Sequence, residues 1–329
     1  MSPTVAASTT TINTTITTGE NMNVEKEESV HIITNNHQEQ LIGILCTVMT
    51  RSSNIHENSP QQNHGSQNNK KPIAVLCHGL ACHKNYFIFP RMESNEYDTF
   101  RFDFSGNGES DGEFSYANYH KEVEDLHCVI NYLKEKLNYS KISIIGHSKG
   151  GNVVLQYASK YPQELQHGVV VNISGRFDMS KTPMNRFSES ERHQLENEGI
   201  FLWKVFTLEP SLCVRKKQEI TTPTNNEEGL TRRYYVTKEA LQERESLNTK
   251  IEFNLLYPLK LYSIHGDNDD VIPFQDSQEF HEFLLEQMRK RNLIDRFSHQ
   301  VICVKGANHF FAGHYETLIG ILKDLLAKE

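Results

Sequence analysis

Short apolar runs alternate with segments of helical periodicity along the chain from Pro72 onward. Several of the runs are apolar at successive positions, which is typical of strands in a parallel sheet that is covered on both faces. They predict strands at residues 73–77, 99–104, 141–145, 168–173, 259–264 and 300–304.

Between these runs, apolar residues recur every three or four positions, as they do on the buried face of a helix. The clearest case is the segment 119–137, which places at helical spacing Val123, Leu126, Val129, Ile130 and Leu133. The segments 152–161, 275–289 and 314–328 behave likewise. Strand–helix alternation of this kind predicts an α/β fold with a doubly wound, mostly parallel sheet.

The amino-terminal part of the chain follows a different pattern. Two apolar runs, 30–34 and 41–50, flank a polar stretch that opens with Asn35-Asn36, and together they predict a hairpin at the start of the sheet. Residues 1–27 are rich in Thr and Asn and poor in apolar groups, which predicts a disordered tail. Residues 51–71 are equally polar and predict a mobile loop, because they cannot bury enough apolar surface to offset their chain entropy.

One long stretch, residues 175–252, interrupts the alternation. It contains no clear strand, is dense in charged residues, and carries Pro183, Pro210 and Pro223. This stretch lies between the predicted strands at 168–173 and 259–264, which are the sixth and seventh sheet runs if the hairpin is counted as two. An insertion there would lie above the carboxyl ends of the strands, where open α/β sheets bind ligands. We therefore expect one α/β domain over residues 28–329, with an inserted lid at approximately 176–252.

Composition narrows the choice of function class. The chain has 329 residues, of which 37% are hydrophobic and 23% are charged, and its formal net charge of −8 argues against nucleic acid or an anionic membrane as the main partner. No apolar run approaches the roughly 20 residues that span a bilayer, and the first basic residue, Lys26, comes too late for a secretory or mitochondrial signal. The six cysteines show no CxxC spacing, which is typical of free thiols in a reducing compartment. We expect a cytoplasmic protein.

A candidate nucleophile stands in the segment Gly146-His147-Ser148-Lys149-Gly150-Gly151. The segment follows an apolar run and precedes a helical one, which is the strand–turn–helix context that the G-x-S-x-G pattern requires. A turn this sharp strains the serine and needs glycine beside it, and it lifts the hydroxyl to a helix amino terminus that favours developing negative charge. The pattern predicts Ser148 as the nucleophile of a serine hydrolase.

A serine hydroxyl needs a base to take its proton, and the base needs an orienting carboxylate. In a fold of this kind the nucleophile, the acid and the histidine follow one another in that order along the chain. His309 follows the last predicted strand and is the expected base. The rival His314 stands at the start of the last predicted helix, where a solvated or capping role is expected. A metal site that uses both histidines is not expected, because their spacing matches no known ligand set.

Three carboxylates compete for the role of the acid. Asp267, Asp269 and Asp270 all lie in the loop after the predicted strand at 259–264. Two of them are expected to solvate or cap the turn. Asp269 is the leading candidate, and Asp267 and Asp270 stay open as alternatives.

The oxyanion hole needs two backbone N–H groups that point to where negative charge develops. One is expected from Lys149, the residue after the nucleophile, and the other from Leu80, in the turn after Cys77-His78-Gly79. His78 is expected to brace this loop. Only the backbone of Lys149 is needed, so its side chain is expected to be solvated or paired with a lid residue.

Two other segments could suggest ligand binding. Residues 103–110 contain a Gly-x-Gly but lack the third glycine before a helix, so a tight turn at the rim of the site is favoured over a dinucleotide site. The lid carries Arg215-Lys216-Lys217 and Arg232-Arg233. These residues could recognise an anionic acyl or alcohol group, although a solvated charged face is favoured.

Taken together, the motifs resemble those of one family. They stand in the expected order, namely His78-Gly79, residues 101–110, residues 146–151, His265-Gly266 with Asp269 and Val271-Ile272-Pro273, and His309. From about Val30 to the carboxyl terminus, the chain resembles the serine aminopeptidase-like branch of the α/β-hydrolases, and within it the cinnamoyl (feruloyl) esterase-like enzymes. The resemblance implies the α/β-hydrolase fold, ester hydrolysis through an acyl-enzyme, Asp269 as the acid, and Leu80 and Lys149 as oxyanion donors.

The chain departs from the family pattern in two places. The segment between Leu80 and Thr99 is short and irregular, so the helix usually placed there is expected to be truncated. Residues 51–71 look like an insertion.

The predicted function is therefore hydrolysis of carboxylic esters of small or medium acyl groups, with Ser148, His309 and Asp269 as the triad and with no cofactor or metal. The expected partner is a small-molecule ester substrate. Alternatives within the enzymes are a thioesterase, a monoacylglycerol lipase and a serine aminopeptidase. The aminopeptidase needs an acidic lid residue to hold the substrate amine, and the candidates are Glu189, Glu191, Glu196 and Glu198.

A binding protein that retains the fold, such as a small-molecule receptor, is the alternative outside the enzymes. Such proteins often lose a member of the triad, and here all three candidate members are present. A hydrolase with an aspartate nucleophile is excluded if Ser148 occupies the elbow.

Overall fold

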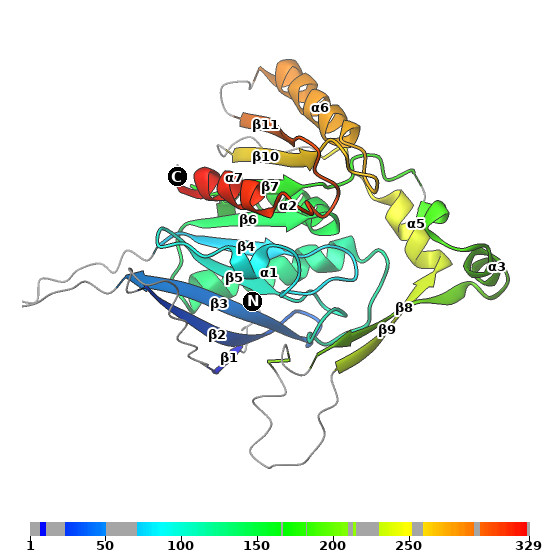
Figure 1. The fold of residues 1–329 in the computed structure, drawn as a ribbon, viewed down its shortest axis with the longest axis horizontal. Helices are drawn as coiled ribbons and strands as arrows, with labels where there is room; N and C mark the ends of the chain where they lie inside the picture. The colour runs from blue at the N-terminus through cyan, green and yellow to red at the C-terminus, as the bar shows by residue number, and fades with distance from the viewer. Residues whose placement is uncertain are drawn as a thin grey trace, which may run out of the picture.

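The computed structural model describes residues 7–10, 24–50, 71–165, 167–181, 183–209, 213–214, 230–251, 259–292 and 297–327. In these ranges nine strands form one sheet, in the order β1-β2-β3-β5-β4-β6-β7-β10-β11 (Figure 1). The strands are β1 (Ala7–Thr10), β2 (Val24–Thr34), β3 (Gln40–Thr50), β4 (Ile73–Cys77), β5 (Asp98–Phe102), β6 (Ile142–His147), β7 (Val169–Ile173), β10 (Leu259–Gly266) and β11 (Phe297–Val304).

The sheet has an antiparallel edge and a parallel centre. Strands β1, β2, β3 and β5 pair antiparallel with one another in that order, and every pairing from β5 through β4, β6, β7 and β10 to β11 is parallel. The predicted hairpin is β2–β3. Its turn is held by Asn35, whose side-chain oxygen accepts from the backbone N–H groups of His37 and Glu39. The prediction of a doubly wound, mostly parallel sheet is confirmed.

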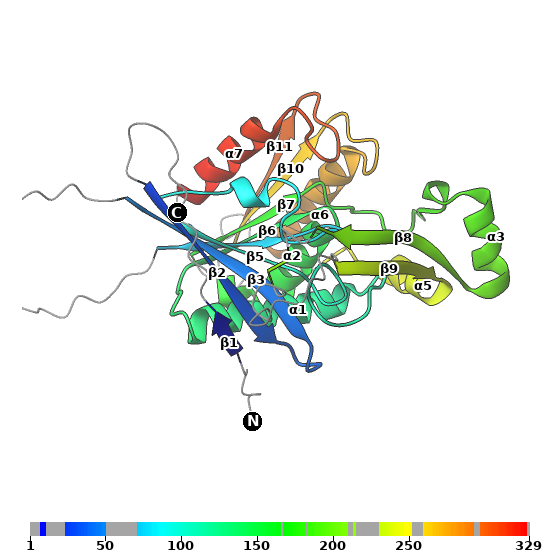
Figure 2. The same ribbon diagram turned by 60° about the horizontal axis from the view of Figure 1, so that its bottom comes forward.

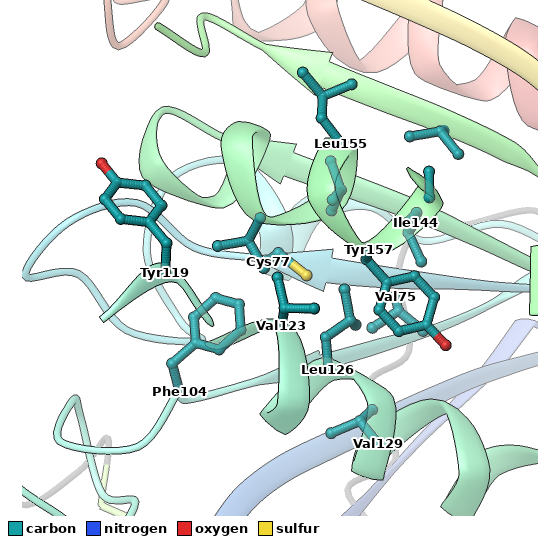
Figure 3. Close-up of a cluster of buried hydrophobic side chains, with 14 of the residues drawn as sticks. Val75, Cys77, Phe104, Tyr119, Val123, Leu126, Val129, Ile144, Leu155 and Tyr157 are labelled. Atoms are coloured by element: carbon teal, nitrogen blue, oxygen red, sulfur yellow. The ribbon is translucent and has the colours of Figure 1, made fainter. Parts of the chain in front are cut away.

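Helices cover both faces of the sheet because the central strands are apolar on both faces. On β4, Val75 and Cys77 pack into a cluster with α1 (Tyr119–Glu135), α2 (Lys149–Lys160) and α6 (Gln275–Arg291). Figure 3 shows part of this cluster. Ala74 and Leu76 point to the opposite face, where they pack with η1 (Phe89–Arg91) and α7 (Tyr315–Ala327). The four helices predicted from periodicity are therefore all present.

The segment between β4 and β5 contains only one short element, the 3₁₀ turn η1. The prediction of a truncated helix in this segment is confirmed. Phe87 has a positive φ of 63°, and its ring stacks on His147 with the two ring centroids 4.2 Å apart. The irregular segment thus supplies an aromatic ring behind the residue that precedes Ser148.

The stretch between β7 and β10 holds η3 (Pro183–Arg186), α3 (Glu189–Glu198), β8 (Ile200–Leu208), β9 (Leu230–Thr237) and α5 (Lys238–Ser246). We call the described residues of this stretch the insertion. Figure 1 shows it on the side to which the arrowheads of β7 and β10 point, and Figure 2 shows it projecting from the sheet.

The prediction that this stretch contains no clear strand is wrong, since β8 and β9 form an antiparallel pair. Aromatic and β-branched residues favour strands, and β8 is rich in them. The register shifts between Leu202 and Lys204, so the period of two residues is broken at Trp203. The strand was missed because of this break and because of the dense charge nearby.

Aromatic rings join the insertion to the main domain. Phe114 and Tyr116, in the loop before α1, lie against Tyr234 and Trp203 with ring centroids 4.2 Å and 5.2 Å apart. The side chain of Arg232 on β9 donates to the carbonyl oxygens of Gly108, Gly112 and Ser110. The prediction of a solvated face is therefore wrong for Arg232, whose guanidinium is hydrogen-bonded to backbone carbonyls. Arg233 is exposed, and Arg215, Lys216 and Lys217 lie outside the described residues.

Parts of the predicted disordered tail belong to the sheet. Residues 7–10 form β1, and β2 begins at Val24 instead of near residue 30. Threonine and serine in β1 gain backbone hydrogen bonds from the edge of β2, which local composition does not reveal. The predicted mobile loop at 51–71 lies, except for Lys71, outside the described residues. Within the described ranges no helix is both long and apolar enough to cross a bilayer.

Candidate active site

Ser148 sits at the junction of β6 and α2 in a strained conformation, with φ 55° and ψ −115°. Positive φ is unfavourable for a residue with a Cβ atom, so surrounding contacts must hold it in place. A Cβ atom on Gly146 would collide with the carbonyl of Gly150, and one on Gly150 would collide with the carbonyl of Cys77. The glycines of the pattern are therefore required by sterics, and a serine, not an aspartate, occupies the elbow.

The structure brings Ser148, His309 and Asp269 together. The Nε2 atom of His309 lies 3.0 Å from the Ser148 hydroxyl, and its Nδ1 atom lies 2.8 Å from Oδ2 of Asp269. Since a carboxylate only accepts, the ring proton sits on Nδ1, and Nε2 is left as the acceptor for the serine proton. This is the arrangement that a general base needs.

Of the three carboxylates predicted as alternatives, only Asp269 contacts His309 within the described residues. Asp269 is held on both oxygens, because Oδ1 accepts from the backbone N–H groups of Val271 and Ile272, while Oδ2 faces His309 and His265. Burial would raise the pKa of Asp269, but the hydrogen bonds from His265 and His309 outweigh it and hold the pKa far below its usual range. Asp267 instead accepts from the backbone N–H of Gly306.

Two further histidines support the site, although the sequence analysis assigned neither a role. His265 donates from Nε2 to the carbonyl of Ile272 at 2.8 Å, and the same atom lies 3.1 Å from Asp269. His147 donates from Nε2 to the backbone carbonyl of His309 at 2.9 Å. Burial, aided by His309, lowers the pKa of His147 to about 3, so the ring is neutral. The signal in the sequence that could have pointed to His147 is its position directly before Ser148.

The loop after β4 lies directly against the elbow. A Cβ atom on Gly79 would come within 3.2 Å of the Ser148 Cβ atom, which leaves little room for a larger residue. His78 accepts from the backbone N–H of Phe104 at Nε2 and donates from Nδ1 to the carbonyl of Gly79. Burial lowers the pKa of His78 to about 4, so it stays in this neutral tautomer and braces the loop, as predicted.

The two predicted oxyanion donors flank Ser148. Within the described part of the chain, the N–H of Leu80 donates to no backbone carbonyl. Lys149 is the first residue of α2, where N–H groups have no partner inside the helix. The backbone therefore leaves both N–H groups as candidates for oxyanion donors.

The side chain of Lys149 does not have its predicted environment. It is buried and lies 2.7 Å from the carboxylate of Glu122 on α1, with Tyr119 beneath the ammonium group. Burial raises the pKa of Glu122 to about 7, against the opposing charge of Lys149, and Asp125 and Glu243 raise it further. The second carboxylate oxygen of Glu122, Oε2, is buried and has no hydrogen-bond partner among the described residues. A pairing across two helices cannot be read from residues near Lys149, which is why the prediction failed.

The segment 103–110 is a tight turn, as predicted, and it is built around a buried ion-pair network. The ammonium of Lys84 lies 2.6 Å from Asp103 and 2.6 Å from Glu109, and all three side chains are almost fully buried. Asp103 also accepts from the backbone N–H groups of Lys84 and Glu109. The network fixes the turn to the loop that carries Leu80.

A cavity of about 710 Å³ opens at Ser148. The main domain contributes Leu80, Cys82, His83, Tyr86 and Phe310 beside Ser148 and His309, and the insertion contributes Arg186, Trp203, Lys204, Val205, Phe206 and Tyr234. Among the described residues no Asp or Glu lines the cavity. The four glutamates of α3 that were candidates for holding a substrate amine therefore do not contribute to its lining. The described residues also contain no cluster of three potential metal ligands.

Comparison with known families assigns the chain. Residues 68–303 match the family described as serine aminopeptidase, S33, and the chain belongs to this family of α/β-hydrolases. The match covers β4 to β11 and includes the insertion.

Curated relatives match over shorter stretches. A candidate esterase/lipase of Haemophilus influenzae is 29% identical over 121 residues, which are 36% of this chain and 38% of that protein. Epoxide hydrolase 4 of Mus musculus is 33% identical over 106 residues, which are 31% of this chain and 28% of that protein. The chain thus spans less than two fifths of the length of these relatives.

Solved structures share the fold over nearly the whole chain. Est1E of Butyrivibrio proteoclasticus, solved with ferulic acid bound, superposes with a TM-score of 0.56 at 17% identity, and the match covers 90% of this chain and 97% of that one. Together with the family assignment, this confirms the predicted α/β-hydrolase fold.

Proposed function

We propose that this protein is a serine hydrolase that cleaves carboxylic esters through an acyl-enzyme, with Ser148 as the nucleophile, His309 as the base and Asp269 as the acid. The observation that carries the proposal is a pair of hydrogen bonds at His309 beside a cavity: Nε2 accepts from the Ser148 hydroxyl at 3.0 Å, and Nδ1 donates to Asp269 at 2.8 Å. Few arrangements other than nucleophilic catalysis need a strained serine in contact with a histidine oriented in this way.

In the proposed mechanism, the Ser148 hydroxyl attacks the ester carbonyl while Nε2 of His309 takes its proton. The N–H groups of Leu80 and Lys149 stabilise the oxyanion. His309 then passes the proton to the leaving alcohol, and the acyl-enzyme is hydrolysed by a water molecule that the same histidine activates. No cofactor takes part in these steps, and the insertion acts as the lid.

The other candidate functions gain less support from the site. A serine aminopeptidase needs a carboxylate to hold the substrate amine, and no described Asp or Glu lines the cavity. A thioesterase or monoacylglycerol lipase would use the same three residues, so substrate panels have to separate these activities. A binding protein would not need the strain at Ser148.

Labelling with a fluorophosphonate probe tests the proposal. Wild type is expected to label, whereas Ser148→Ala and His309→Ala are not. His314→Ala is the matched control, because His314 lies in the same loop region, outside the cavity, and its Nδ1 atom bonds to the carbonyl of Ala312. A folded wild-type protein that does not react with the probe would contradict the proposal and favour the binding protein.

A further inference from the structure

Charge is distributed unevenly between the surface and the cavity. The whole chain carries a formal net charge of −8. The cavity at Ser148 nevertheless has two permanently charged side chains in its lining, and both are cations, Lys204 on β8 and Arg186 on η3. The lining histidine His83 does not add to this charge, since burial lowers its pKa. A positively charged cavity in a protein of negative net charge indicates that the site selects its substrates by their charge.

Neither cation is neutralised by a carboxylate of the described residues. The ammonium of Lys204 lies over the ring of Trp203, 4.2 Å from its centroid. Arg186 donates to the backbone carbonyl of Val271 at 3.1 Å, which leaves its charge uncompensated. Arg232 and Arg244 each donate to several backbone carbonyls and Lys181 lies near Asp178, and none of these three residues lines the cavity.

The two cations line the same cavity as the reacting groups Ser148 and His309. Lys204 on β8 lines this cavity together with Leu80 and Cys82 of the loop after β4. Arg186 shares the carbonyl of Val271 with Arg176, and the N–H of Val271 binds Asp269. A substrate held at Ser148 would therefore share the cavity with two cations that have no acidic partner among the described residues.

We propose, building on the proposed function, that the preferred substrates are esters that carry a second, negatively charged group, held by Lys204 and Arg186. A substrate carboxylate could form an ion pair with either cation, because no described Asp or Glu in the cavity lining competes for them. An ester with a free amine would meet two like charges, so cationic esters are the disfavoured class.

Three para-nitrophenyl esters with acyl chains of six carbons test this. They are the hexanoate, the adipate half-acid and the aminohexanoate with a terminal amine. We expect kcat/KM to fall in the order adipate, hexanoate, aminohexanoate, and the lead of the adipate to shrink as salt is added, because salt screens charges that are exposed. A second pair, with the carboxylate placed on the alcohol instead of the acyl group, locates the anion.

Variants identify the side chains responsible. Lys204→Gln and Arg186→Gln are each expected to lower kcat/KM for the anionic ester about two- to fivefold more than they lower it for the neutral ester. Arg233→Gln is the matched control, because this substitution also removes one positive charge. Arg233 lies on the neighbouring strand β9 and lines a different cavity.

The inference is overturned if neither anionic ester outperforms its neutral match, or if Arg233→Gln has the same effect as the two cavity variants. Turnover of the neutral ester that is lost in Ser148→Ala would then leave the proposed function standing. Absence of turnover with all esters would overturn both.

Discussion

The cavity at Ser148 has two walls of different construction. The wall from the main domain consists of loops at the carboxyl ends of β4, β6, β10 and β11. The charged groups that support these loops lie outside the cavity lining and are buried and paired, as in Lys84 with Asp103 and Lys149 with Glu122. The wall from the insertion consists of the β8–β9 pair and the end of η3, with exposed apolar side chains such as Val205 and with two cations, Lys204 and Arg186, that lack acidic partners among the described residues.

The difference separates positioning from recognition. A buried ion pair is costly to break and has one geometry, so it suits groups that must not move relative to the reacting atoms. An exposed cation on a strand can be exchanged at small cost to stability. We expect substitutions in the first wall to change kcat and stability, and substitutions in the second wall to change KM and selectivity.

The largest effect is expected at Asp269. Asp269→Asn keeps the shape but favours the wrong tautomer of His309, so kcat should fall by about 10⁴-fold. Steady-state hydrolysis of a para-nitrophenyl ester measures this. Asp267→Asn, in the same loop but away from His309, should retain nearly full activity, and equal losses in the two variants would sink the assignment of the acid.

Breaking the Lys84 network should cost stability. Lys84→Met leaves Asp103 and Glu109 buried without their cation, and we expect a loss of about 3–5 kcal/mol in the free energy of unfolding. Lys160→Met is the control, because Lys160 forms an exposed ion pair with Glu124 and should cost at most about 1 kcal/mol. Urea titrations compare the two, and similar losses would contradict the contrast between buried and exposed pairs.

Glu122→Gln should lower kcat about tenfold with little change in KM, because Lys149 then lacks its counter-charge beside the nucleophile. In wild type the carboxylate loses its charge below its pKa of about 7, so the acid limb of the profile of kcat against pH should be steeper than in the variant. Since this pKa lies above the usual 4.5, the folded state binds the proton more tightly, and stability relative to the variant should fall as pH rises from 4.5 to about 7.

Glu124→Gln, on the exposed side of the same helix α1, is the matched control for this experiment. An unchanged kcat and acid limb in Glu122→Gln would show that the pair does not position the elbow. Lys149→Arg, which keeps the ion pair, should retain more activity than Lys149→Met.

The smallest effect is expected in the wall from the insertion. Trp203→Ala removes an aromatic surface from the cavity and the ring beneath the ammonium of Lys204, so KM for aromatic esters should rise about three- to tenfold while kcat stays within twofold. The rate of fluorophosphonate labelling at saturation should not change. A loss confined to kcat would mean that the insertion also positions the reacting groups.

Much of the fold, and the three side chains that meet at the candidate site, could be predicted because their signals are local. The strands and helices of the main domain have clear apolar periods, and the glycines beside Ser148 are imposed by steric contacts within the turn. Features that depend on distant partners could not be predicted. Lys149 and Glu122 are 27 residues apart, Arg232 bonds to a turn more than a hundred residues earlier, and the bulge at Trp203 hides the period of β8.

The hydrogen bonds of Asp269 have a consequence for the energy of activation. Its Oδ1 atom is held by two backbone N–H groups and its Oδ2 atom by two histidines, so the carboxylate has no free rotation about its Cβ–Cγ bond. In the proposed mechanism, the negative charge that stabilises the imidazolium is already in place when His309 takes the proton from Ser148. The reorganisation that water would need around such a charge pair is completed during folding, before any substrate binds.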